Sequence, residues 1–179
     1  MSLVKEIIYR LRGEYTTEKL IKMGLKVGKN FGRLNGVILD PSHCWLITIG
    51  DNVTMAPRVH ILAHDASTQM NLKKAKIGRV TIGNNVYIGL NSIVLWNNQI
   101  GSNVIIGAGS IVTSDIPDNS VYAGNPARYI CSYDEYMKKN KKLINERPNF
   151  ESPFWIWPQK NITEWKDMKK KLSDGIGYL

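Results

Sequence analysis

The sequence predicts an all-β chain wound as a triangular coil, and two regularities point to it. The first is that an aliphatic residue recurs at every sixth position, at Ile82, Ile88, Val94, Ile100, Ile106 and Val112. The second is that glycine often follows this aliphatic residue. Neither a helix nor a simple strand has a period of six residues. We therefore expect a short strand, a corner and a repeat, with about eighteen residues in each three-sided coil and the aliphatic side chains pointing inward.

Length and composition agree with one folded chain. The 179 residues are 43% hydrophobic and 22% charged, enough to bury a core without disulfide staples. No apolar run reaches the roughly eighteen residues that span a bilayer, and we expect neither a transmembrane helix nor a signal peptide. Cys44 and Cys131 have no Cys-x-x-Cys spacing, so a zinc ribbon or a redox pair is not indicated and a reducing cytoplasm suits them.

The elements follow in order along the chain. An N-terminal helical segment, 1–26, has apolar residues interleaved with charges over Leu3–Met23, the pattern of an amphipathic helix. The coil itself is expected over 27–130. The segment 131–179 is a helical C-terminal extension, with helices expected over Tyr133–Asn145 and Ile162–Leu172 and with proline-punctuated chain between them. Its tryptophans Trp155, Trp157 and Trp165 suit packing of that tail, with sugar stacking as the alternative.

One interruption of the repeat is long. The in-phase positions Ile61 and Ile82 are 21 residues apart, three more than one full coil, and the segment between them is polar. We expect a loop over 65–76 that leaves the coil, with His64 at its root. Function is expected where the regularity breaks.

The net charge of +9 comes from 24 basic and 15 acidic residues. Such a field attracts a nucleic acid, an anionic lipid, an acidic glycan or a polyphosphate cofactor. The basic residues are interleaved with acidic ones and no base-reading motif is present, which argues against nucleic acid. Contact with a membrane is expected to be peripheral at most.

Four segments resemble the hexapeptide-repeat acyltransferases, and most of all the galactoside/maltose and polysaccharide O-acetyltransferase branch. They are IGDNVTMAPRV (49–59), IGNNVYIG (82–89), IGAGSIVTSDIP (106–117) and AGNPAR (123–128). The resemblance implies a left-handed parallel β-helix that assembles as a homotrimer, with active sites between neighbouring subunits. It also implies acetyl-CoA as co-substrate and no required metal.

A general base is needed to remove the proton of an attacking hydroxyl, and a neutral imidazole suits that task. His64, in AHDAST, stands where the resemblance places the family's base. Asp65 follows it and is expected to orient the imidazole, with a backbone carbonyl as the other candidate. His43 is expected to be a turn residue or part of the acceptor site, and His60 a surface residue.

The donor site is carried over from the resemblance position by position. Ala108 falls where the family's backbone contacts the pantetheine arm, and Thr113 and Arg128 fall where it contacts the phosphate-bearing end of CoA. Ser114 replaces the usual lysine and Leu90 a usual small residue, and both positions belong to the expected donor site. Tyr87 and Trp96 are the aromatic candidates for the acceptor pocket.

The sequence therefore predicts an O-acetyltransferase that acts on a hydroxyl of a sugar or polysaccharide precursor. An N-acetyltransferase of an amino sugar and a serine O-acetyltransferase would use the same machinery. Two alternatives of other classes remain: a γ-type carbonic anhydrase, suggested by His43, His60 and His64, and a non-catalytic glycan-binding β-helix.

Overall fold

The structure is a computed structural model that describes residues 14–150 and 162–178, without the side chains of 162–165. The expected helix over Leu3–Met23 therefore lies partly outside the described residues, as do Trp155, Trp157 and the side chain of Trp165. The chain divides into two compact units, Met1–Tyr133 and Asp134–Leu179, and each is described by itself.

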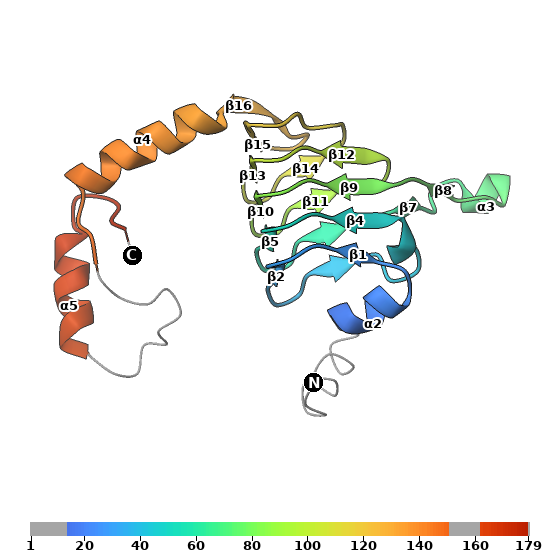
Figure 1. Ribbon diagram of the computed structural model, residues 1–179, viewed down its shortest axis with the longest axis horizontal. Helices are drawn as coiled ribbons and strands as arrows, with labels where there is room; N and C mark the ends of the chain where they lie inside the picture. The colour runs from blue at the N-terminus through green and yellow to red at the C-terminus, as the bar shows by residue number, and fades with distance from the viewer. Residues whose placement is uncertain (1–13, 151–161, 179) are drawn as a thin grey trace. The chain divides into compact units, whose positions relative to one another are not determined.

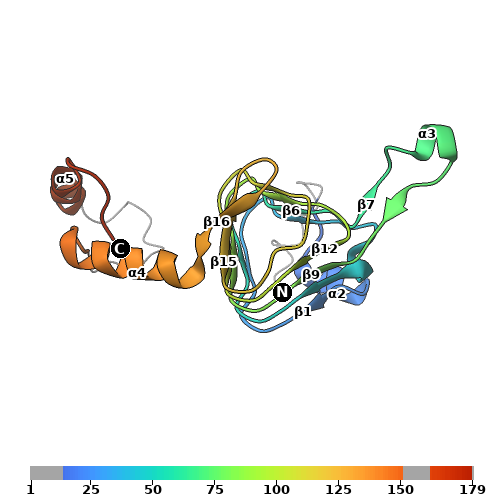
Figure 2. The same cartoon turned by 90° about the horizontal axis from the view of Figure 1, so that it is seen from above.

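The first unit is a three-sided coil, and each side is a parallel sheet built from one short strand per turn (Figures 1 and 2). Sheet A contains β1 (Lys26–Val27), β4 (Ile47–Ile49), β9 (Val80–Ile82) and β12 (Asn98–Ile100). Sheet B contains β2 (Gly32–Arg33), β5 (Thr54–Met55), β10 (Val86–Ile88), β13 (Val104–Ile106), β15 (Ser120–Ala123) and the antiparallel β16 (Arg128–Ser132). Sheet C contains β3 (Ile38–Leu39), β6 (His60–Ile61), β11 (Ile93–Val94) and β14 (Ile111–Val112).

The inward ladder of aliphatic side chains is confirmed. The six residues of the repeat from Ile82 to Val112 are each at most 1% exposed. Ile88 lies in register between Met55 and Ile106 of the neighbouring coils. Residues one coil apart therefore stack directly on one another, eighteen positions apart where the repeat is uninterrupted, as in Ile88 and Ile106, and the six-residue period is the period of the core.

The corner between sheets A and B shows how the chain turns. The left-handed backbone conformation there belongs to asparagine, with φ between 54° and 56° at Asn30, Asn52, Asn85, Asn103 and Asn119. The first four of these side-chain amides each donate to the amide oxygen of the next coil's asparagine at 2.8–3.0 Å, and Asn119 accepts the last of these bonds. Asparagine tolerates this conformation and stacks in such ladders.

Glycine serves a different purpose at this corner. A Cβ added to Gly50 would lie 2.6 Å from the carbonyl oxygen of Gly83, and one added to Gly83 would lie 2.7 Å from the carbonyl carbon of Gly101. These glycines therefore allow the backbones of successive coils to approach closely, while asparagine makes the turn.

The segment after Ile61 is an arm rather than an irregular loop. β7 (His64–Asp65) pairs antiparallel with β8 (Lys76–Ile77), and the short helix α3 (Gln69–Leu72) lies at the tip (Figure 2). The 21-residue interval does not contain a full coil, because Ile61 lies on sheet C and Ile82 on sheet A, the next side. The arm thus replaces a single corner.

Two further elements lie near the first coils. The helix α2 (Thr17–Lys22) begins at Thr16, whose hydroxyl accepts a hydrogen bond from the Lys19 N–H, and buries Leu20. The 3-10 helix η1 (Cys44–Leu46) stands between β3 and β4.

The second unit contains α4 (Tyr133–Glu146) and α5 (Ile162–Lys171). Its returning chain end is tied to α4 by a hydrogen bond of 3.0 Å from the Tyr178 hydroxyl to the Asn140 amide oxygen, and the Arg147 guanidinium donates to the Asp174 carbonyl. Among the described residues, none of the helices has the length and apolar character needed to cross a membrane.

The core ladder makes a prediction for two neighbouring residues of β12. Ile100→Ala should lower the free energy of unfolding by about 2–5 kcal/mol, because it leaves a cavity between stacked coils. Gln99→Ala, on the exposed face of the same strand, should change it by less than about 0.5 kcal/mol. Denaturant titration at one fixed protein concentration measures both, and equal effects would contradict the inward assignment of Ile100.

Candidate active site

Two breaks in the repeat stack at one corner, between sheets C and A. In one coil the chain passes through η1 on its way from β3 to β4, and in the next it makes the arm between β6 and β9. A backbone hydrogen bond of 2.9 Å from the Asp40 N–H to the Ile61 carbonyl joins the two coils there. This stacking brings Asp40 and His64 together although they are 24 residues apart in the sequence.

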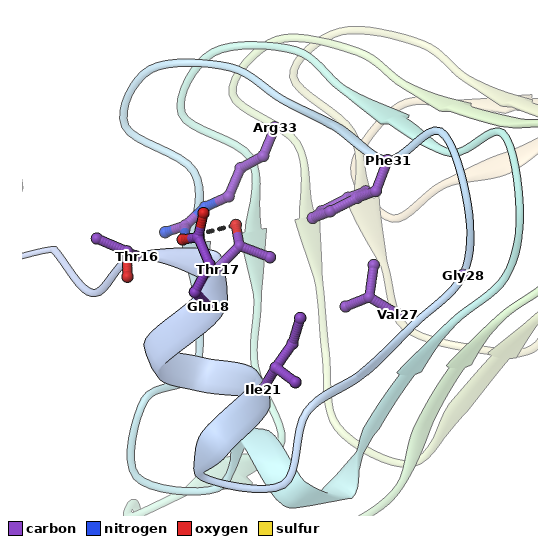
Figure 3. Close-up of a pocket in the computed structure, with 8 residues that line it drawn as sticks. All are labelled: Thr16, Thr17, Glu18, Ile21, Val27, Gly28, Phe31 and Arg33. Atoms are coloured by element: carbon purple, nitrogen blue, oxygen red, sulfur yellow. Dashed lines mark hydrogen bonds between the residues drawn. The ribbon is translucent and has the colours of Figure 1, made fainter. Parts of the chain in front are cut away.

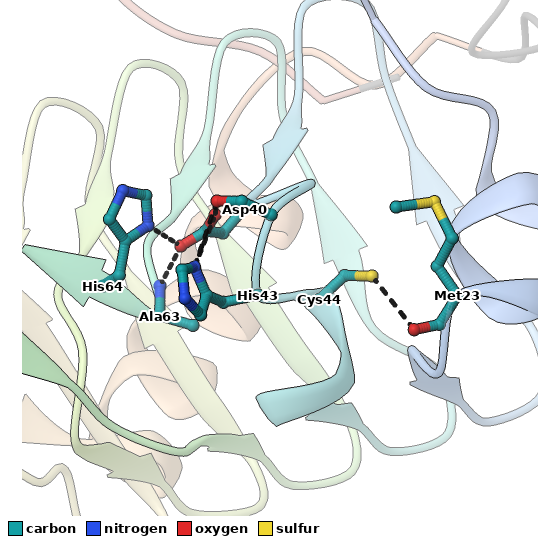
Figure 4. A network of polar contacts seen from close by, with 7 residues as sticks. Met23, Asp40, His43, Cys44, Ala63 and His64 are labelled. Atoms are coloured by element: carbon teal, nitrogen blue, oxygen red, sulfur yellow. Dashed lines mark hydrogen bonds and ion pairs between the residues drawn. The ribbon is translucent and has the colours of Figure 1, made fainter.

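The pair is the centre of the site. The His64 Nδ1 lies 2.5 Å from the Asp40 Oδ2 (Figure 4). The Asp40 side chain is 1% exposed, whereas that of His64 is 33% exposed. A buried carboxylate therefore holds an imidazole that reaches solvent.

Asp40 is held ionised by its surroundings. Burial alone would raise the pKa of this carboxyl, but hydrogen bonds from the His64 ring, the Ser42 hydroxyl (2.8 Å) and the Ala63 N–H (2.9 Å) outweigh burial and lower the pKa below its usual value. The ionised carboxylate has only acceptor atoms, so it requires a proton on the His64 Nδ1.

The chemical consequence concerns the second ring nitrogen. A neutral imidazole with its proton on Nδ1 carries a lone pair on Nε2. Among the described residues, no hydrogen bond engages the His64 Nε2. The arrangement therefore presents a proton acceptor to solvent and stabilises the imidazolium that forms when it is used.

The prediction for Asp65 as the orienting group is wrong. The Asp65 carboxylate pairs with the Lys76 ammonium at 2.7 Å and accepts hydrogen bonds from Ser67. Those contacts lower the pKa of Asp65 to about 2. In β7 it faces away from the ring it follows, because successive side chains of a strand point to opposite sides. Its contacts instead fasten the root of the arm.

His43, the residue immediately before η1, also lies at the site. Its ring centroid lies 4.7 Å from that of His64, and its Nδ1 lies 3.1 Å from the Ser42 hydroxyl. The expected turn role is present as well, because the His43 N–H donates to the Asp40 carbonyl.

Donor atoms of Asp40, His43 and His64 lie within 4.8 Å of one another, and this is the group among the described residues that has the donors for a metal ion. The set contains a carboxylate and two imidazoles, and His60 on β6 is not part of it. The three-histidine arrangement of the carbonic anhydrase alternative is therefore not gathered in the described chain.

The residues expected to bind CoA lie at two corners. Leu90 and Ala108 stack at the corner between sheets B and C, where the Gly109 N–H donates to the Leu90 carbonyl at 2.8 Å. Thr113 and Ser114 are exposed just after β14, at the same corner as His64 but in a later coil. Arg128 is exposed at the start of β16, and its Nη1 donates to the Ala127 carbonyl.

The two aromatic candidates lie apart. Trp96 follows β11 at the His64 corner, and the Lys76 ammonium sits 5.1 Å from the centroid of its ring. Tyr87 is exposed on the outer face of sheet B, the side opposite that corner. Within one chain, the structure brings Trp96 toward the arm and leaves Tyr87 away from His64.

A second cavity and the cysteine Cys44 lie outside this site. A cavity beneath the first coil lies between α2 and β2 and is lined by Thr16, Thr17, Glu18, Ile21, Val27, Gly28, Phe31 and Arg33 (Figure 3). It contains none of the three histidines. Cys44 is buried, and burial raises the pKa of its thiol, which disfavours the thiolate a nucleophile requires.

The sequence is similar to those of known proteins. The chain is 39% identical to protein CapG from Staphylococcus aureus over 145 residues, which cover 76% of this chain and 83% of that protein. It is 42% identical to the galactoside O-acetyltransferase of Escherichia coli over 118 residues, covering 64% of this chain and 57% of that enzyme. No protein-family model matches the chain.

A solved structure extends the likeness to three dimensions. The maltose O-acetyltransferase from Clostridium difficile 630 superposes with a TM-score of 0.54 at 42% identity, covering 61% of this chain and 59% of that one. The chain thus spans somewhat more than half the length of the two named sugar acetyltransferases. It belongs to the hexapeptide-repeat acyltransferase family.

The site makes a prediction that separates two aspartates. Asp40→Asn should lower the rate of acetyl transfer by between about 10² and 10⁴-fold, because the amide no longer enforces the Nδ1-protonated ring. Asp65→Asn removes the same charge from β7, at the residue next to His64, and should change the rate of acetyl transfer by less than about threefold. Steady-state kinetics of both folded variants provide the measurement. A larger loss of rate in Asp65→Asn than in Asp40→Asn would contradict the assignment of Asp40 as the partner of His64.

The same carboxylate makes a prediction about acid stability. The pKa of Asp40 in the folded chain lies below its ordinary value of 3.8, so the unfolded chain binds the proton first as the pH falls. Asp40 therefore stabilises the fold at neutral pH, and that contribution is lost as the pH falls below about 4. The difference in Tm between the wild type and Asp40→Asn should shrink from pH 7 to pH 3. An unchanged difference would contradict the lowered pKa.

Proposed function

We propose that the protein transfers the acetyl group of acetyl-CoA to a hydroxyl of a sugar or polysaccharide precursor. The observation that carries the proposal is the His64–Asp40 pair, in which a buried carboxylate leaves the Nε2 of a partly exposed ring as proton acceptor. The likeness to galactoside and maltose O-acetyltransferases supports a sugar as the acceptor.

In the proposed reaction, His64 takes the proton of the acceptor hydroxyl on Nε2 as the oxygen attacks the thioester carbonyl. Asp40 stabilises the resulting imidazolium through Nδ1. Collapse of the tetrahedral oxyanion breaks the carbon–sulfur bond, and the imidazolium returns its proton to the departing thiolate. No acyl-enzyme forms in this scheme, and His43, at 4.7 Å from the base, belongs to the acceptor side.

The donor is proposed to lie along the exposed corners. The small side chain of Ala108 leaves the backbone beside Leu90 open to a pantetheine arm. Thr113 and Ser114 offer hydroxyls and Arg128 a guanidinium for the phosphate-bearing end of CoA. Trp96, and Tyr87 of a neighbouring subunit, are proposed as aromatic walls of the acceptor pocket.

The assembly is proposed to be a homotrimer with its active sites between subunits. The arm offers exposed apolar side chains for such a contact, namely Met70, Leu72 and Ile77. We further propose that residues 27–130 form the acetyltransferase domain, whose outer strands reach slightly beyond these bounds, to Lys26 in β1 and to Ser132 in β16. The free thiols of Cys44 and Cys131 are consistent with a reducing cytoplasm.

Release of free CoA thiol tests the function directly. The wild type should release thiol from acetyl-CoA only when a suitable acceptor is present, in a panel of free sugars, amino sugars, nucleotide sugars and serine. His64→Ala should lower the acceptor-dependent rate by between about 10² and 10⁴-fold, because the base is lost. Circular dichroism and sedimentation establish that the variant is folded and assembled like the wild type, and full activity in that variant would refute the mechanism. If only serine or an amino sugar stimulates thiol release, the acceptor group is the serine hydroxyl or the amine rather than a sugar hydroxyl.

A further inference from the structure

A cleft of about 340 Å³ lies on the outer face of sheet A, outside the site described above. Its walls combine two cations, two hydroxyls and an indole, and none of its lining residues is acidic: Lys26, Trp45, Leu46, Thr48, Arg79 and Thr81. Such a surface has the chemistry to hold a polar, negatively charged molecule.

The strand register builds one wall of this cleft. Lys26 of β1 is paired with Thr48 of β4, and Thr48 is paired with Thr81 of β9. Three exposed side chains therefore stand in a row across successive coils, about 4.8 Å apart. Arg79 adds a second cation just before β9.

Neither cation is neutralised within the described chain. Among the ion pairs of the described residues, none involves Lys26 or Arg79. Two uncompensated charges at the edge of one cleft create a local positive potential that attracts anions. Lys26 and Arg79 contribute to the net positive charge of the chain, and neither has a role in the proposed acetyl transfer.

The cleft also contains an indole that is open to solvent. Trp45 is 54% exposed, although large aromatic side chains are usually buried. Its neighbour Cys44 is buried, with Sγ 3.7 Å from the carbonyls of Leu20 and Met23 (Figure 4 shows the contact with Met23). Gly24, at φ +107°, approaches so closely that an added Cβ would lie 2.8 Å from the Trp45 Cβ. The backbone of Trp45 is therefore fixed while its ring remains exposed.

The cleft adjoins the catalytic corner through one residue. The His43 ring lies 6.3 Å from the Trp45 ring and 4.7 Å from the His64 ring, centroid to centroid. Figure 4 shows Asp40, His43 and Cys44 close together along one segment, and Trp45 is the next residue in the sequence. A molecule longer than a single sugar unit can therefore contact the cleft and His64 at the same time.

We infer that this cleft is a subsite for the anionic part of a saccharide acceptor, either a uronate of an oligosaccharide or the phosphate of a sugar nucleotide. The inference rests on the proposed sugar acetylation and specifies the charge of its acceptor. The Trp45 ring packs against the C–H face of a sugar, Thr48 and Thr81 hydrogen-bond its hydroxyls, and Lys26 and Arg79 bind the carboxylate or phosphate.

Equilibrium binding without acetyl-CoA tests the subsite independently of catalysis. Titration calorimetry on the full chain compares three probes: a tetrasaccharide of alternating glucuronate and N-acetylglucosamine, a neutral tetrasaccharide of glucose, and UDP-N-acetylglucosamine. At least one anionic probe should bind more tightly than the neutral one, and more weakly as sodium chloride is raised. The anionic probe that depends on the cleft identifies the source of the charge.

Matched variants locate that binding. Lys26→Gln and Arg79→Gln should each raise the Kd of the anionic probe by about two- to fivefold, and Trp45→Ala by about tenfold, with partial recovery in Trp45→Phe. Lys29→Gln removes the same charge from an exposed position outside the cleft, and should leave the Kd within about twofold.

The outcomes are distinguishable from those of the proposed function. Equal affinity for anionic and neutral probes, equal effects of Lys26→Gln and Lys29→Gln, or no binding of any probe would each overturn the subsite. None of these results depends on thiol release, which tests His64 separately. Conversely, cleft-dependent binding with no acceptor-stimulated thiol release would support the subsite and count against the acetyl transfer.

Discussion

The close stacking of successive coils is the constraint on which the rest of this structure depends. Each strand pairs with the strand one coil away, so each coil must lie directly over its neighbour. Side chains of the same type therefore fall on one another: aliphatic residues in the core and asparagines at one corner, where their amides form a continuous ladder. Glycines such as Gly50 are required where a Cβ would strike the next backbone.

The same regularity explains where chemistry can be placed. A coil that repeats strictly offers similar surroundings in every turn, and a polar cluster needs a local departure from the repeat. Here η1 and the arm depart at the same corner in adjacent coils. Stacking then places the buried Asp40 against His64, so the rigid repeat orients the proposed catalytic pair, which neither insertion contains alone.

The segment around η1 connects this pair to the outer face of sheet A. Its first part supplies Asp40 and His43, its buried middle residue Cys44 fixes it against α2, and Trp45 emerges beside two cations. One short insertion thus joins the proposed proton-transfer chemistry to a positively charged surface. In physical terms, a base that acts on any hydroxyl gains selectivity from a neighbouring site that recognises charge.

The sequence by itself determined the coil and its inward residues and predicted His64 as the candidate base, because the six-residue period and its interruption are local patterns. It did not identify Asp40, since a carboxylate 24 residues upstream becomes a partner only when two coils stack; Asp65, adjacent in sequence, pairs with Lys76 instead. It likewise could not assemble Lys26, Trp45 and Arg79 into one cleft. Cross-strand register and the path of η1 decided those contacts, and both are properties of the tertiary structure.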